Sequence, residues 1–150
     1  MPHTARNPDF ERLVRESFAN QKAMRTLGAR LVSVGPGAVE IGLPYREDLT
    51  QQHGFLHAGV VTAILDSSCG YAAFSLMPPG AGVLSVEFKV NLMAPAQGEV
   101  LIARARMLRP GRTISVCQAD GFMRTGDRET PVATMLATMM TVTGRGDVVG

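Results

Sequence analysis

The sequence has no run of lysine or arginine and only two cysteines among its 150 residues. A formal net charge of +2 without a basic cluster argues against a general nucleic-acid-binding protein. Cys69 and Cys117 both lie in apolar segments. They are therefore interpreted as small buried side chains in a reducing compartment, and not as a disulfide or part of a metal site.

The chain also lacks an uninterrupted apolar segment of membrane-spanning length. Residues 1–8 contain no apolar signal core, and the longest apolar stretch is interrupted by Asp66 and by serine and glycine positions. We therefore expect a cytoplasmic protein that does not bind membranes. With 45% hydrophobic and 19% charged residues, the composition predicts one globular domain over residues 1–150. Residues 1–7 and 144–150 are expected to be flexible tails.

Periodicity predicts the order of the elements. Apolar residues at helical spacing from Phe10 to Met24 predict an N-terminal helix that starts near Pro8 and stops at Gly28. Two β-branched runs around Gly35-Pro36-Gly37 predict a hairpin, and a polar loop follows over residues 44–50. After Pro79-Gly80, four alternating segments predict a four-strand antiparallel meander, over residues 84–92, 100–108, 113–123 and 132–143.

The central feature is a second helix, predicted over residues 57–76. It is almost entirely apolar, so other elements must cover it, and one sheet curling around it satisfies this demand. The short turns favour an antiparallel sheet of roughly six strands. Because such a sheet keeps an open edge and an uncovered face, we expect the protein to dimerise.

Asp66 is the single carboxylate in this apolar helix. A poorly solvated carboxylate is costly unless it is paired or functional. It is therefore either a structural group hydrogen-bonded by Ser67, Ser68 or a neighbouring amide, or a group that activates water or attacks a carbonyl. The free N–H groups at the helix start, near Ala58 and Gly59, would polarise such a carbonyl as an oxyanion hole does.

The spacing within the helix limits how these groups meet. Asp66 follows His57 by nine residues, which places the two on opposite sides of the helix and about 13 Å apart. One helix cannot bring both to one reacting atom, whereas two antiparallel helices across a dimer interface can. The spacing thus predicts a site between subunits. His53 and His57 are interpreted as loop histidines, and no Ser-His-Asp or metal-ligand spacing is evident, so neither metal nor cofactor is expected.

A family resemblance rests on three features: Gln51 and Leu56-His57-Ala58-Gly59 opening the helix, Asp66 inside it, and the alternating segment Ser85–Pro95. In these the chain resembles the hotdog-fold acyl-CoA thioesterases of the phenylacetate-degradation (PaaI-like) type, with Ala58 for a glycine and Gln51 for the commoner asparagine. The resemblance implies an α+β hotdog fold: a curved antiparallel sheet of about six strands wrapped around one long central helix, with an N-terminal helix. It also implies a homodimer, assembled into a dimer-of-dimers tetramer.

The resemblance implies roles for six residues. Asp66 would be the nucleophile or general base, and the amides of Ala58 and Gly59 would polarise the thioester. Gln51 and His57 would position the thioester or water, and Ser85 would orient water. The alternation nevertheless places Ser85 on the face opposite Leu84, Val86 and Phe88, which are expected to pack on the helix. A bulge or an interface location would reconcile the two.

The implied reaction is hydrolysis of an acyl- or aryl-CoA thioester to the free acid and CoA. Arginine recognises the phosphates of CoA, and the candidates at two turns are Arg109, Arg112, Arg124 and Arg128. Taken individually, each is better interpreted as a solvated turn residue, and Arg112, after Pro110-Gly111, is the strongest candidate. Phe55, Tyr71 or Met77 would line the acyl pocket. A non-catalytic acyl-CoA sensor on the same fold is the alternative, which Asp66 disfavours. A dehydratase would need a different acid–base pair, and none is apparent.

Overall fold

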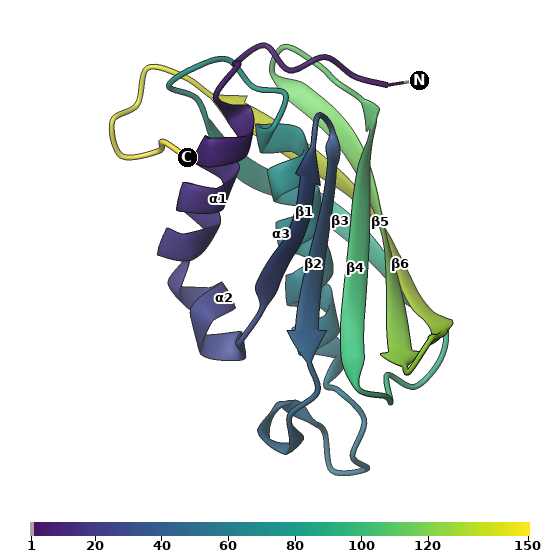
Figure 1. The fold of residues 1–150 in the computed structure, drawn as a ribbon. Coiled ribbons are helices and arrows are strands. Elements are labelled where there is room, and N and C mark those ends of the chain that lie inside the picture. Colours follow the sequence, from purple (N-terminus) through teal and green to yellow (C-terminus); the bar gives the residue numbers. More distant parts are fainter. Residues whose placement is uncertain (1) are drawn as a thin grey trace.

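The computed structural model describes residues 2–150. One sheet wraps around a central helix, and shorter helices precede the first strand (Figure 1). The six strands are all antiparallel and follow the order β1-β2-β4-β5-β6-β3, and α3 packs on the sheet. This confirms the expected α+β hotdog fold. The elements are α1 (Phe10–Asn20), α2 (Lys22–Leu27), β1 (Arg30–Gly35), β2 (Ala38–Pro44), the 3₁₀ turn η1 (Glu47–Leu49), α3 (Ala58–Phe74), β3 (Gly82–Leu92), β4 (Val100–Arg109), β5 (Ile114–Thr125) and β6 (Arg128–Val142).

The predicted four-strand meander is wrong in one connection. Strands β4, β5 and β6 follow one another as hairpins, but β3 pairs with β6 at the sheet edge and does not contact β4 as a neighbour. Between Leu92 and Val100 the chain passes from the edge strand β3, past β6 and β5, to the interior strand β4. Side-chain alternation specifies which face of a strand is buried, not which strand lies beside it, so the order was not readable from the pattern.

The N-terminal helix is confirmed, with one interruption. At Gln21 the backbone is extended, which separates α1 from α2. Gly28 ends α2 in a left-handed conformation with φ of 82°, which is a common way for a helix to stop. Within residues 2–150, no helix is both long and apolar enough to cross a bilayer. Both terminal segments contact the rest of the fold. Asn7 is buried, and the Gly150 N–H donates a hydrogen bond to the carbonyl of Ala81.

The sheet covers only one side of α3. Ile64, Leu65, Cys69 and Ala72 are fully buried against it. Full burial of an aliphatic side chain as large as Ile64 or Leu65 contributes roughly 1.5–3 kcal/mol to the free energy of folding. The opposite side of the helix is a stripe of mostly small residues that are exposed or half-buried. We call it the open stripe, and it comprises Ala58, Gly59, Thr62, Ala63 and Asp66.

Strand β3 carries a bulge that changes which side chains face α3. The pairing with β6 shifts between Ser85 and Glu87, so the alternation reverses there. Ser85 pairs with the fully buried Met139 and therefore points toward the helix. The prediction that Leu84, Val86 and Phe88 pack on the helix is wrong, since these side chains are 44%, 53% and 42% exposed. The bulge explains the exposure of Leu84 and Val86. Phe88 pairs with the buried Ala137 and therefore stays on the helix-facing side, so its exposure comes from the edge position of β3.

Leu65 tests how much stability the α3–sheet contact supplies. Leu65→Ala is expected to lower the free energy of unfolding by about 2–5 kcal/mol, because the fully buried side chain leaves a cavity in a close-packed core. The matched control is Val32→Ala on the edge strand β1, whose side chain is 52% exposed and whose loss should cost less than about 0.5 kcal/mol. Urea denaturation of both variants checks this, and equal losses would contradict the assigned core.

Candidate active site

The start of α3 presents one backbone N–H without a partner. His57 is the N-cap residue, and its Nδ1 accepts a hydrogen bond of 2.8 Å from the Gly59 N–H. The N–H groups of Val60 and Val61 donate to the His57 carbonyl. Among the described residues no acceptor bonds the Ala58 N–H, which is solvent-exposed. Of the two predicted carbonyl-polarising amides, only that of Ala58 is therefore free, and His57 serves as a helix cap.

Gln51 and Phe55 share a cavity with this free N–H. The loop is held by hydrogen bonds from the Gln51 N–H to the Phe55 carbonyl, at 2.9 Å, and from the Tyr45 hydroxyl to the Gly54 carbonyl, at 2.8 Å. The Gln51 side-chain oxygen accepts from the His53 N–H, which leaves its NH₂ group for a ligand. The cavity has a volume of about 440 Å³ and a largely apolar wall. Its lining residues are Gln51, Phe55, Leu56, Ala58, Val61, Leu92, Met93, Ala94, Pro95, Ala96 and Val132.

Asp66 lies in a second cavity, of about 200 Å³, between α1, α3 and β3. The Ser85 hydroxyl donates a 2.7 Å hydrogen bond to Oδ1 of Asp66. Burial raises the pKa of the Asp66 carboxyl above its ordinary value, while the bond from Ser85 opposes this rise by favouring the charged form. The sequence thus named both members of this pair, and the bulge in β3 brings them into contact.

The same cavity contains polar residues that the sequence did not reveal as neighbours of Asp66. Ser17 of α1 and Gln21, the extended residue between α1 and α2, both contact the Tyr71 hydroxyl, at 3.4 Å and 3.1 Å. The Ser67 hydroxyl donates to the Gln21 side-chain oxygen, at 3.2 Å. Ser17 lies in α1, and Gln21 is the extended residue that follows this helix. Sequence spacing does not tell which other element these two residues contact.

One chain keeps the two halves of the predicted site apart. The cavity at the helix start and the cavity of Asp66 share no lining residue. Ala58 and Asp66 are separated by eight residues of α3, or roughly 12 Å along its axis. Gln51, Phe55 and Ala58 therefore form one group, and Asp66 and Ser85 form another. No cluster of three His, Cys, Asp or Glu side chains that would hold a metal ion occurs within residues 2–150.

The four candidate arginines do not form one group either. Arg109 and Arg112 flank the β4–β5 turn, whereas Arg124 and Arg128 flank the β5–β6 turn. The two turns lie at opposite ends of β5 (Figure 1). A strand of 12 residues spans roughly 36 Å. Arg112 lines a pocket beyond the C-terminal end of α3. In one chain, Arg112 thus lies toward the C-terminal end of α3, and Arg124 and Arg128 lie toward the Ala58 end.

Several known proteins are similar to this chain in fold, and some of them also in sequence. The family model of the thioesterase superfamily matches residues 53–130. A thioesterase family protein from Silicibacter pomeroyi has a similar structure, with a TM-score of 0.88 and 52% identity over 90% of this chain and 99% of that one. Human acyl-coenzyme A thioesterase 13 is 32% identical over 64% of this chain and 69% of its own length. The E. coli PaaI protein, 16% identical over 93% of this chain and 98% of that one, shares the fold with a TM-score of 0.83.

These similarities agree with the resemblance seen at Leu56-His57-Ala58-Gly59 and Asp66. The matched range contains the helix start, Asp66 and Ser85. It also contains strands β3, β4 and β5 in full and the first residues of β6. The chain belongs to the thioesterase superfamily.

Proposed function

We propose that the protein hydrolyses acyl-CoA thioesters in a site shared by two subunits. Asp66 of one subunit acts as general base or nucleophile, and the Ala58 N–H of the other polarises the thioester carbonyl. The observation that carries the proposal is the Asp66 carboxylate, which is desolvated, hydrogen-bonded by Ser85 and open to a cavity. A carboxylate with a raised pKa is a better base than a solvated one.

These groups allow two routes of thioester hydrolysis. In the general-base route Asp66 takes a proton from water as the water oxygen attacks the carbonyl carbon. Negative charge then develops on the carbonyl oxygen, where the Ala58 N–H at the positive end of α3 stabilises it. When the tetrahedral intermediate collapses, the carbon–sulfur bond breaks and the CoA thiolate leaves with the proton that Asp66 had taken from water. In the nucleophilic route Asp66 attacks the carbonyl carbon first, and the carbon–sulfur bond breaks as the CoA thiolate leaves and a mixed anhydride forms. Water then hydrolyses the anhydride, which releases the acid and restores the Asp66 carboxylate, and the proton set free goes to the thiolate.

The open stripe supports the shared site. It contains both the free Ala58 N–H and Asp66, and its small side chains allow a second helix to approach closely. Two copies of α3 packed antiparallel along this stripe would place the start of each helix opposite Asp66 of the other. A two-fold axis then makes two equivalent sites.

The edge strand β3 supports dimerisation at the same place. Within residues 2–150, one side of β3 has no strand partner, and β3 and the residue that follows it carry large exposed apolar side chains. Pairing of two β3 edges would satisfy their backbone groups and bury these side chains. They are Val86, Phe88, Leu92 and Met93, each between 42% and 54% exposed. Further apolar positions on β5 and β6, Ile114 at 47% and Leu136 at 51%, would join two dimers into a tetramer.

The acyl group of the substrate would occupy the cavity at the helix start. Phe55, Leu92 and Met93 provide an apolar wall there, and Gln51 provides a polar group next to Ala58. Such a lining suits an aliphatic or aromatic acyl chain with one polar end. The methyl group of Ala58, where the family has glycine, leaves the N–H in place and narrows the entrance to it.

Asp66→Asn tests the catalytic role. The variant is expected to lose at least about 100-fold in kcat, the scale of general-base catalysis, while its melting temperature stays equal or rises. The rise is expected because a carboxyl whose folded pKa is raised opposes folding at pH values above that pKa, and asparagine removes this cost. Thiol release from short, medium, long and aryl acyl-CoA measures the activity.

The control for this variant is Asp127→Asn in the exposed β5–β6 turn, which should keep wild-type rates. A folded Asp66→Asn protein with undiminished kcat would overturn the mechanism. Tight binding of an acyl-CoA by the wild-type protein without any turnover would instead favour a non-catalytic acyl-CoA-binding protein.

Ser85→Ala tests the contact between β3 and the carboxylate. Without the hydroxyl, the charged form of Asp66 loses its hydrogen bond, so the pKa of this carboxyl rises further. The acid limb of the pH profile of kcat/KM should therefore move to higher pH, and the rate at low pH should fall by about tenfold, the scale of a hydrogen bond to a charged group. Ser33→Ala on β1 serves as the control. An unmoved acid limb would show that Ser85 does not tune Asp66.

Mixed dimers test whether the site is shared. Ala58→Pro removes the proposed N–H donor at a position where proline fits a helix, and Asp66→Ala removes the carboxylate. Each variant alone should be inactive. After subunit exchange, half of the dimers contain one intact site, so about a quarter of the wild-type activity should return. No recovery in verified heterodimers would mean that both groups act within one chain or do not act together.

A further inference from the structure

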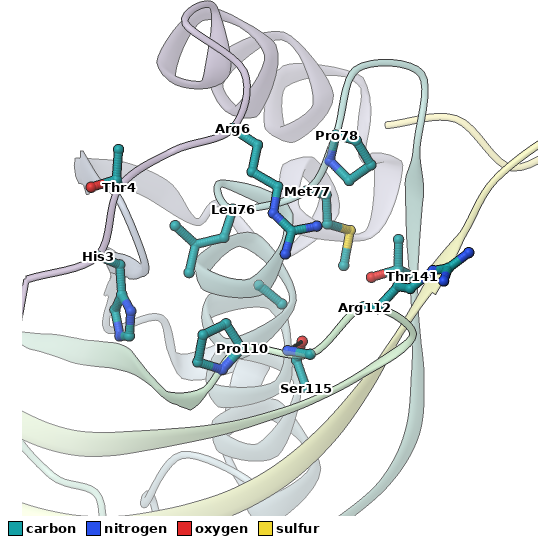
Figure 2. A pocket seen from close by; sticks show the side chains of 12 residues that line it. His3, Thr4, Arg6, Leu76, Met77, Pro78, Pro110, Arg112, Ser115 and Thr141 are labelled. Atoms are coloured by element: carbon teal, nitrogen blue, oxygen red, sulfur yellow. Dashed lines mark hydrogen bonds between the residues drawn. The ribbon is translucent and has the colours of Figure 1, made fainter.

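A pocket of about 190 Å³ lies beyond the C-terminal end of α3, under the N-terminal arm, residues 2–7 (Figure 2). Its walls come from four parts of the chain that are distant in sequence: the arm, the end of α3 with the segment after it, the β4–β5 turn with the start of β5, and the end of β6. The lining residues are His3, Thr4, Arg6, Ala73, Leu76, Met77, Pro78, Pro110, Gly111, Arg112, Ser115 and Thr141.

The arm is fixed at both ends. The His3 ring Nε2 is 3.2 Å from the Met107 carbonyl oxygen, and Asn7 is only 7% exposed. The Asn7 side-chain oxygen accepts a 3.0 Å hydrogen bond from the Asp9 N–H, at the start of α1. Arg6 lies between these two anchors. Figure 2 shows its side chain reaching into the pocket beside Leu76 and Met77. The fold thus holds a guanidinium group over this pocket.

Positive charge in the pocket is not balanced by the protein. Arg6 and Arg112 both line it, no carboxylate does, and neither arginine forms an ion pair within residues 2–150. Ser115, which is 4% exposed, accepts a bond from the Gly111 N–H, so its O–H remains available as a donor. Two exposed guanidinium groups beside one buried hydroxyl donor, without an acidic partner, are typical of a phosphate site.

The pocket also lies in line with Asp66. Ala73 lines it and follows Asp66 by seven residues, or about 10 Å along α3. A neighbouring cavity shares Met77 and Pro78 with it, and shares residues 149 and 150 with the cavity of Asp66. A substrate with its thioester at Asp66 would therefore reach the pocket with a phosphate-bearing end directed toward the C-terminal end of the helix.

We propose that Arg6 of the N-terminal arm, together with Arg112, binds a phosphate group of the CoA part of the substrate. This inference rests on the proposed function and adds to it a residue that lies outside the part of the chain matched by the family model. The arm then belongs to the substrate site and gives selectivity for thioesters that carry phosphate. It has no part in the chemistry at the carbonyl.

Arg6→Gln tests this with two thioesters of the same acyl group, one of CoA and one of the phosphate-free thiol N-acetylcysteamine. The variant should raise KM for the CoA ester by about tenfold, the scale of a charge-assisted hydrogen bond, with kcat unchanged. Kinetics with the phosphate-free ester should not change. Arg12→Gln, on the exposed face of α1, is the matched control and should behave as wild type with both substrates. Equal effects on both esters, or no effect on either, would overturn the inference.

Calorimetry with free CoA separates this inference from the proposed activity. Wild-type protein should bind CoA, and Arg6→Gln should weaken the binding about tenfold, with a smaller dependence on salt. If no thioester is hydrolysed but CoA binding still depends on Arg6, then the proposed reaction fails and the phosphate site stands. CoA binding that is equal in Arg6→Gln and in wild type overturns the phosphate site, whatever the activity is.

Discussion

The structure depends on one constraint, the burial of an apolar helix by a sheet that covers only one of its sides. Ile64, Leu65 and Cys69 satisfy the sheet-facing side completely, and this contact fixes the curvature and the layer order of the fold. The other side remains as the open stripe, on which Ala58 and Asp66 both lie. The same helix that organises the core therefore carries the two groups of the proposed site, which lie too far apart to act together within one chain.

Two local interactions prepare these groups in opposite ways. At the helix start, the His57 side chain accepts a hydrogen bond from the Gly59 N–H. Among the described residues the Ala58 N–H has no acceptor, so it is the free donor at the positive end of α3. In the middle of the helix, burial destabilises the charge on Asp66 while Ser85 stabilises it. Catalytic groups are often kept at such a cost to folding, because a base with a raised pKa is more effective near neutral pH.

Much of the fold and part of the site could be predicted from the sequence. The helices, the hairpin, six strands and the separation of Ala58 from Asp66 follow from periodicity and helix geometry, which are local properties. The place of β3 beside β6 and the arm over the β4–β5 turn could not be predicted, since both depend on contacts between distant segments. Ser85 shows the limit most clearly. Strict alternation directs it away from the helix, and only the bulge, which has no signal in the alternation itself, turns it toward Asp66.

The central claim is that each site combines the Ala58 N–H of one subunit with Asp66 of another. A crystal structure with a CoA analogue in which a ketone replaces the thioester tests this most directly. We predict that the ketone oxygen lies about 2.7–3.1 Å from the Ala58 nitrogen of one subunit, with the ketone carbon facing the Asp66 carboxylate of its partner. Contacts of the ketone with Ala58 and Asp66 of the same subunit, or a ketone bound away from both, would contradict the account.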